Sequence, residues 1–214
     1  MNEVGSIGYV CTIPLLFEKF IPSYTTLVHY NATHNIPCAY LRATHGDQAF
    51  GRNELAQKFV GDWLLMLDTD MSFAPDIFEV MVDIANVHNI DILSGVYCKK
   101  EPPYSPVAFK YIDEKFYPLD LATMSEIPPL LPIEAAGGGC LLTNRSIFDR
   151  IKNELNEEPF TVSSPYPEDL SFFKRVLKLG IQPYLATDIQ CGHFMLKELT
   201  FQDYLEYNKE KKDG

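Results

Sequence analysis

The sequence has a shortage of positive charge, which bears on its partners. Lysine and arginine together number 18 against 29 aspartates and glutamates, so the formal net charge is −11. General nucleic-acid binders neutralise phosphates with clustered basic side chains, and we therefore expect no nucleic-acid partner. A ligand that carries phosphate would need local help from a metal ion, a few placed Lys or Arg residues, or main-chain N–H groups.

Cysteine pairs and long apolar runs are missing as well. The five cysteines are odd in number and show no C-x-x-C spacing. This pattern predicts reduced core thiols, although one disulfide stays possible. No run of 18 apolar residues occurs, and no basic region followed by an uninterrupted apolar run opens the chain. We therefore expect no transmembrane segment and a cytoplasmic location.

What is present is typical of one compact α/β domain. The chain has 214 residues, of which 46% are hydrophobic and 22% charged, enough for a sizeable core. In its first part, short apolar runs alternate with amphipathic ones, which predicts stacked β-α units around a largely parallel sheet. The expected strands are 7–13, 38–42, 63–67 and 90–94, and the expected helices are 20–34, 51–60 and 74–87. Ser72 is a possible cap of the third helix, with Pro75 in its first turn.

The pattern changes after residue 94. Strand-like pieces at 106–111 and 115–119 predict a small antiparallel excursion from the sheet. We expect helices from Ser146, over 168–179 and near 201–211, and a strand near Tyr184. The fold class is therefore a single α/β domain with a mixed, mainly parallel sheet, divided into a half over 1–95 and a half over 96–214.

The segment Asp68-Thr69-Asp70 carries the strongest chemical signal. It follows the apolar run 63–67, so both carboxylates should lie at the carboxyl edge of the sheet, where open α/β sheets bind ligands. One carboxylate could reach a hard cation while the other reaches a ribose or a metal-bound water. A purely structural role, in which the two aspartates cap the following turn, explains the pattern about equally well.

Three further segments could complete a site. Glu168 and Asp169 open an amphipathic helix, where the helix dipole alone accounts for Glu168, while Asp169 could serve as a general base. His193 could add a third metal ligand suited to Mn²⁺, although a single histidine is more often a hydrogen-bonded structural residue. The glycines at 137–139 fit no phosphate-binding loop and could let the backbone approach a bulky ligand, or form a turn or bulge.

Taken in order, these pieces resemble the GT-A glycosyltransferases, in particular the small family-2-like enzymes of bacteria and phages. The resemblance covers most of the chain. It is carried by the segments Thr12-Ile13-Pro14, Gly51-Arg52-Asn53, Asp68-Thr69-Asp70, Ser94-Gly95-Val96-Tyr97, Gly137-Gly138-Gly139, Glu168-Asp169 and Gly192-His193.

The resemblance implies a GT-A, Rossmann-like domain that moves a sugar from a nucleoside diphosphate sugar, by default a UDP-sugar, to a carbohydrate or other hydroxyl acceptor. Residues 1–95 would bind the nucleotide, and 96–214 the sugar and acceptor. Asp70 and His193 would hold Mn²⁺ or Mg²⁺, assisted by Asp68, and Asp169 would be the base of an inverting reaction. The remaining donor-binding positions would be Thr12, Pro14, Arg52, Asn53, Asp68, Gly137, Gly138 and Glu168.

Two other functions are consistent with parts of the pattern. A phosphatase of the haloacid dehalogenase type also has an Asp-x-Asp loop after an apolar strand, but its late G-D-x-x-x-D partner is missing here. A non-catalytic nucleotide-sugar binding module would keep the donor-binding residues and perform no transfer, and Asp169 would then have no role.

Overall fold

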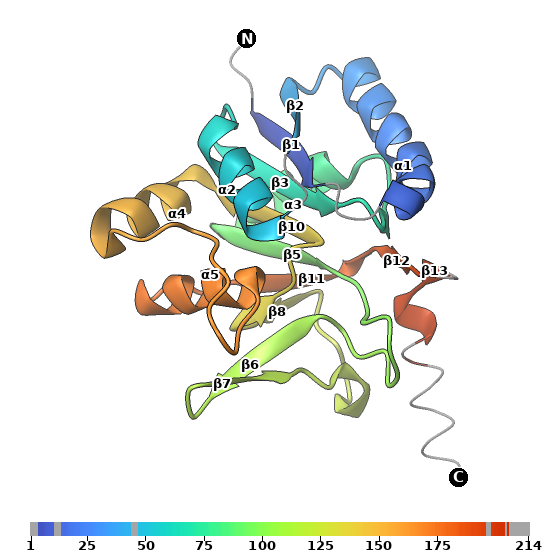
Figure 1. The fold of residues 1–214 in the computed structure, drawn as a ribbon. Coiled ribbons are helices and arrows are strands. Elements are labelled where there is room, and N and C mark those ends of the chain that lie inside the picture. The colour runs from blue at the N-terminus through green and yellow to red at the C-terminus, as the bar shows by residue number, and fades with distance from the viewer. Residues whose placement is uncertain (1–3, 11–13, 44–46, 196–197, 204, 206–214) are drawn as a thin grey trace.

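The computed structural model describes residues 4–10, 14–43, 47–195, 198–203 and 205. Its centre is a seven-stranded sheet of order β2-β1-β3-β10-β5-β11-β8 (Figure 1). In that order the strands are Cys38–Arg42, Gly5–Val10, Trp63–Asp68, Cys140–Asn144, Ile92–Val96, Tyr184–Gln190 and Leu130–Pro132. β10 and β8 run against the common direction of the other strands. The sheet is therefore mixed and mainly parallel, as the sequence predicts.

Helices cover both faces of this sheet (Figure 1). Buried side chains of α1 and α3 belong to one apolar cluster, and those of α2, α4 and α5 belong to another. The sheet separates the two clusters, which gives three layers. The bounds are α1 Pro14–Thr33, α2 Gln48–Lys58, α3 Ile77–His88, α4 Arg145–Arg150 and α5 Glu168–Lys178, with a 3₁₀ turn η1 at Leu121–Thr123 and a π turn η2 at Ile151–Leu155.

β3 shows why an apolar run forms the central strand. Leu64 and Met66 contribute to the cluster beneath α2 and α5, whereas Leu65 and Leu67 contribute to the cluster beneath α1 and α3. Successive side chains of a strand point to opposite faces, so a strand covered on both sides must be apolar at every position. The run stops being apolar at Asp68, where the strand reaches the edge of the sheet.

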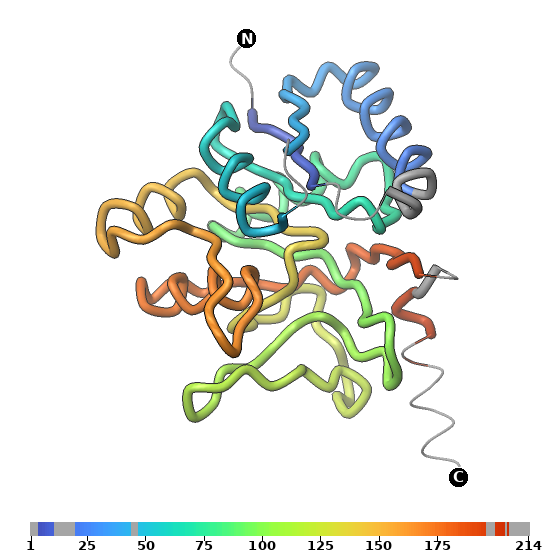
Figure 2. Tube along the Cα trace, viewed as in Figure 1, coloured from blue at the N-terminus to red at the C-terminus, as the bar shows by residue number. Residues whose placement is uncertain are grey.

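Two small sheets flank the central one. The hairpin β6 (Ala108–Ile112) and β7 (Lys115–Pro118), with β9 (Ala135–Ala136), forms the antiparallel excursion that the sequence predicts. In the other small sheet, β12 (Gly192–Phe194) pairs with β4 (Met71–Ser72) and β13 (Glu198–Leu199). Figure 2 shows the late, red part of the chain returning beside the segment that follows β3. This return brings residues from both ends of the sequence to one edge.

Some local expectations were wrong. Ser72 does not cap α3: it pairs with Gly192 in β4, and Asp76 occupies the position before the helix. α1 and α2 begin earlier than expected, and α2 is capped by Asp47, whose Oδ1 accepts from the N–H of Phe50 at 2.8 Å. Strand β10 was not expected, because its apolar residues directly follow the glycine run and its partners are distant in sequence.

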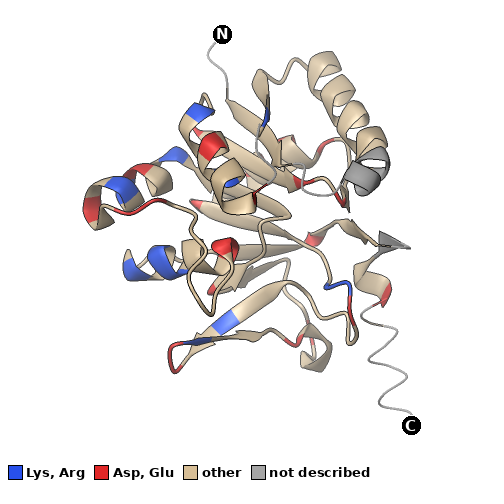
Figure 3. Cartoon of the chain, viewed as in Figure 1, with Lys and Arg blue, Asp and Glu red and all other residues tan. Residues whose placement is uncertain are grey.

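Charged residues of the described chain lie mainly outside the central sheet. Figure 3 shows charged residues of both signs over the helices and loops, with the central strands almost free of them. Within the described ranges, no helix has the length and apolar composition needed to cross a membrane. The four described cysteines form no disulfide with one another. Most of the helix expected at 201–211 lies outside the described residues; 201–203 are helical.

Candidate active site

Asp68 and Asp70 lie at the carboxyl edge of the sheet. Asp68 is the last residue of β3, and Asp70 follows in the turn before β4. This edge borders a cleft of about 400 Å³. The cleft is lined by Gln48, Asp68, Asp70, Tyr97, Lys99, Lys100, Glu101, Val107 and His193. The predicted position of the two carboxylates at a ligand-sized opening therefore agrees with the structure.

Arg52 links three neighbouring groups beneath this edge of the sheet by hydrogen bonds. Its side chain comes from α2 and is buried, with 1% of its surface exposed. Its Nη2 donates to Asp68 Oδ1 at 2.8 Å, its Nη1 to the carbonyl of Gly138 at 2.9 Å, and its Nε to Glu168 Oε1 at 3.3 Å. A buried guanidinium with a partner for each nitrogen keeps its neighbours in fixed positions. Arg52 thus acts through Asp68 and Glu168, and direct contact with a nucleotide stays a prediction.

The charges around Arg52 shift one another's pKa values. Burial lowers the pKa of Arg52, but the carboxylates of Asp68, Glu168 and Asp169 outweigh it, so the guanidinium stays charged. Burial raises the pKa of Asp68, and the nearby charge of Asp70 adds to this, while Arg52 opposes it. This cluster concentrates buried charge at one point of the molecule, as functional sites commonly do.

Asp169 is the second residue of α5, next to Glu168. Its Oδ1 accepts from the N–H of Leu170 at 2.7 Å. Burial, together with the carboxylate of Glu168, raises its pKa from 3.8 to about 6, although Arg52 acts in the opposite direction. A carboxyl group with a pKa near 6 is ionised at neutral pH and still able to accept a proton. Burial raises the pKa of Tyr97, and the charges of Asp68 and Asp169 add to this.

Asp70 and His193 meet because β4 pairs with β12. His193 is opposite Met71 in this pairing, and the N–H of Phe194 donates to the carbonyl of Asp70 at 2.7 Å. His193 Nε2 lies 3.4 Å from Asp70 Oδ2, and the ammonium of Lys100 contacts the same oxygen. Burial raises the pKa of Asp70, but the hydrogen bonds from His193 and Lys100 outweigh it and bring the pKa to about 2.

The donor atoms around Asp70 fit a divalent cation. Asp70 Oδ1 is buried and has no hydrogen-bond partner within the part of the chain that the structure describes. His193 Nδ1 lies 2.7 Å from the carbonyl of Cys98, which can only accept, so Nδ1 carries a proton and Nε2 is the ring nitrogen on the Asp70 side. No group of three His, Cys, Asp or Glu ligands occurs among the described residues. Mn²⁺ and Mg²⁺ are commonly held by one or two protein ligands plus substrate phosphates.

The glycine run makes room for protein side chains. A Cβ on Gly138 would lie 2.4 Å from the guanidinium carbon of Arg52, and one on Gly137 would lie 2.0 Å from the hydroxyl of Tyr97. The same hydroxyl accepts from the N–H of Gly139 at 3.0 Å. The glycine run therefore lies against Arg52 and Tyr97 of the protein itself, and the close approach to a bulky ligand stays a prediction. A border with a sugar stays a prediction.

The remaining predicted positions contribute differently. Asn53 holds the main chain of Phe160: its Nδ2 donates to the carbonyl at 2.7 Å, and its Oδ1 accepts from the N–H at 3.0 Å. Its amide is thus committed to the loop before α5, and a nucleotide contact stays a prediction. Thr12 lies outside the described residues, and Pro14 is described only as the first residue of α1.

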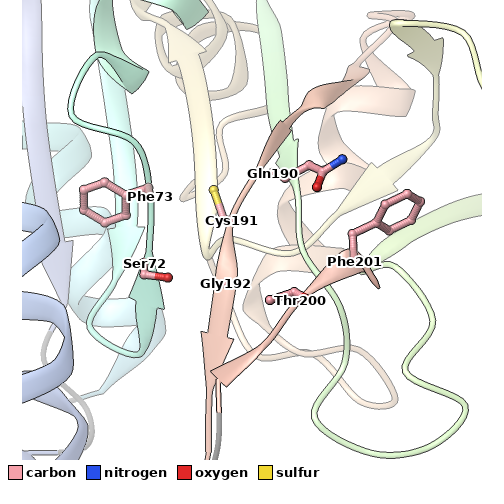
Figure 4. A pocket seen from close by; sticks show the side chains of 7 residues that line it. All are labelled: Ser72, Phe73, Gln190, Cys191, Gly192, Thr200 and Phe201. Atoms are coloured by element: carbon pink, nitrogen blue, oxygen red, sulfur yellow. The ribbon is translucent and has the colours of Figure 1, made fainter. Parts of the chain in front are cut away.

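A second cavity, of about 300 Å³, lies beside β12 and differs in chemistry from the cleft (Figure 4). It is lined by Ser72, Phe73, Gln190, Cys191, Gly192, Thr200 and Phe201, and it shares none of these residues with the cleft. None of these side chains is an acid, a base or a histidine. It therefore offers no charged side chain for a metal ion or a phosphate, and the cleft is the better candidate site.

Sequence analysis assigned no role to Tyr97 or Lys100, although both face the cleft. Tyr97 belongs to the Ser94–Tyr97 segment that resembles the family, but its role depends on the distant glycine run. Lys100 offered a weak signal: Lys99 and Lys100 are adjacent basic residues, just past a predicted strand, in a chain poor in positive charge.

Comparison with known proteins identifies the fold. No protein-family model and no curated protein matches the sequence. Among solved structures, A197 from STIV is 17% identical, with a TM-score of 0.57, over 91% of this chain and 88% of that one. GalNAc-T7, solved with UDP, GalNAc and Mn²⁺, is 12% identical, with a TM-score of 0.55, over 95% of this chain and 47% of that one. This chain thus spans about half the length of GalNAc-T7. The shared architecture is the GT-A fold of glycosyltransferases.

Proposed function

We propose that this protein is a metal-dependent glycosyltransferase that moves a sugar from a nucleoside diphosphate sugar to a hydroxyl acceptor. The observation that carries this proposal is the composition of the cleft. Asp70, one buried oxygen of which has no hydrogen-bond partner among the described residues, lines a ligand-sized opening together with His193. A second carboxylate, Asp68, lines the same opening and is fixed in place by a buried arginine. GalNAc-T7, which has the same fold, was solved with UDP, GalNAc and Mn²⁺. We infer that the donor is a UDP-sugar.

In this proposal Asp70 and His193 hold Mn²⁺ or Mg²⁺. The bound cation supplies Lewis-acid neutralisation of the departing diphosphate. Asp68, held by Arg52, is placed to bind the ribose or a metal-bound water. Residues 1–95 contribute most of the nucleotide side, and 96–214 contribute the sugar and acceptor side.

Asp169 is the proposed general base of an inverting transfer. It accepts the proton of the acceptor hydroxyl as that oxygen attacks the anomeric carbon. Its pKa of about 6 suits this role, because the ionised form predominates at neutral pH. We expect kcat/KM to rise about tenfold per pH unit below pH 6 and to level off above it.

The test is a panel of nucleotide sugars with Mn²⁺, read by release of nucleoside diphosphate, with and without sugar acceptors. Asp169→Asn should bind UDP like the wild type and lose at least about a hundredfold in turnover. Asp149→Asn, which removes an exposed carboxylate from α4, is the matched control and should retain turnover. Equal turnover of Asp169→Asn and the wild type would refute the base assignment.

The same assay separates the rival functions. If the protein turns over none of the donors but binds UDP in the presence of Mn²⁺, it is a non-catalytic binding module. Release of phosphate from simple phosphomonoesters would indicate a phosphatase of the haloacid dehalogenase type. Against the phosphatase, Asp68 would have to be the nucleophile, whereas one of its oxygens is bound to the buried Arg52.

A further inference from the structure

Lys100 forms an ion pair with the carboxylate of Asp70, to which the proposed cation would also bind. It follows β5 and reaches across the cleft, and its ammonium contacts Asp70 Oδ2. Both side chains are largely buried, with 22% of Lys100 and 16% of Asp70 exposed. The same oxygen lies 3.4 Å from His193 Nε2, while no described residue forms a hydrogen bond with Asp70 Oδ1. One positive charge is therefore already placed where a metal would bind.

An ammonium and a divalent cation cannot share this carboxylate at low energetic cost. At about 4 Å, like charges repel strongly wherever water is largely excluded. Two outcomes are possible: the lysine keeps the cation out, or an additional anion joins and neutralises both. A nucleoside diphosphate supplies such an anion, because its phosphate oxygens can accept from an ammonium and bind the metal at once.

We propose that Lys100 is a charge-exchange residue, which pairs with Asp70 in the empty site and moves to the diphosphate of the donor when the cation binds Asp70. This inference rests on the proposed function. It predicts that Mn²⁺ and the nucleotide bind cooperatively, each strengthening the affinity of the other by the same factor. Lys100 would weaken binding of the metal alone and strengthen binding of the nucleotide.

The test is isothermal titration calorimetry of Lys100→Met, first with MnCl₂ alone and then with UDP in saturating MnCl₂. Loss of one charge-assisted hydrogen bond corresponds to about tenfold or more in affinity. Mn²⁺ alone should therefore bind about tenfold more tightly to the variant, and UDP about tenfold more weakly. Opposite changes in the two constants are specific to an exchange, since a general loss of the site would weaken both.

Lys99→Met is the matched control. Lys99 also borders the cleft, but its ammonium lies over the ring of Phe109, 5.5 Å from the ring centroid. Lys99→Met removes one positive charge from the same cleft and leaves the Lys100–Asp70 ion pair intact. The affinities for Mn²⁺ and for UDP should each change less than about threefold, because only long-range electrostatics are lost. Lys100→Arg keeps the charge and should retain the cooperativity.

The outcomes distinguish the two proposals. If wild-type protein binds no UDP in the presence of Mn²⁺, the proposed function and the exchange are both wrong. If wild type binds UDP but Lys100→Met leaves both affinities unchanged, or weakens both, the exchange alone is wrong. Lys100→Gln provides the same comparison if the methionine variant does not fold, as judged by circular dichroism.

Discussion

Replacing Asp169 by asparagine should stabilise the protein at neutral pH while removing turnover. The pKa of Asp169 is raised from 3.8 to about 6, mainly by burial. Ionising this carboxyl in the folded protein therefore costs about 3 kcal/mol at neutral pH, since one pKa unit is about 1.4 kcal/mol. This pKa already includes the favourable influence of Arg52 on the charge, so we expect a gain of about 3 kcal/mol for Asp169→Asn. Asparagine can still accept from the N–H of Leu170.

The pH dependence identifies the cause of this gain. Between about pH 4 and 6, the folded wild type keeps a proton that the unfolded chain has lost. The free energy of unfolding of the wild type, relative to that of Asp169→Asn, should therefore fall as the pH rises through this window. Below pH 4 the gap should be small, and above pH 6 it should be constant at about 3 kcal/mol.

Urea denaturation of both proteins at pH 4.5, 6 and 7.5 measures this gap. Asp149→Asn, which changes an exposed carboxylate, should stay within about 0.5 kcal/mol of wild type at each pH. A gap that is equal at pH 4.5 and 7.5, or an Asp169→Asn variant less stable than wild type at pH 7.5, would show that Asp169 is not a destabilised buried carboxylate. Asp169 would then not be a residue that lowers the stability of the protein in favour of its activity.

Two further predictions concern the arginine beneath the cleft. Arg52→Met removes the partner of one buried carboxylate, Glu168, and of one partly buried carboxylate, Asp68. It should lower the free energy of unfolding by about 3–5 kcal/mol, and by less at low pH where the carboxylates can take up protons. Urea denaturation at two pH values checks this, with Lys178→Met, which removes an exposed ammonium paired with Glu157, as a control that should change stability by less than about 1 kcal/mol. Gly138→Ala places a Cβ 2.4 Å from the guanidinium carbon of Arg52 and should destabilise the fold by about 1–3 kcal/mol in thermal unfolding, whereas an unchanged melting temperature would mean that the arginine can move away.

Local patterns in the sequence determined the elements that carry the site. The uninterrupted apolar run before Asp68 is sufficient to predict a strand buried on both faces that ends in carboxylates, because burial and the two-residue period are local properties. The amphipathic helix that begins at Glu168 and ends before Gly180 is predictable for the same reason. The resemblance of the ordered segments to GT-A glycosyltransferases then led to the fold, which comparison of structures supports.

Only the tertiary structure decided which of these groups meet. Asp70 and His193 are brought together by pairing of the short strands β4 and β12, which are too short to be recognised in the sequence. Arg52 selects Asp68 and Glu168 because α2, β3 and α5 converge at one edge, and Lys100 reaches Asp70 from the loop after β5. Such contacts depend on which distant segments pack against each other and on which charged groups are buried together. These are properties of the packed chain, and no local pattern specifies them.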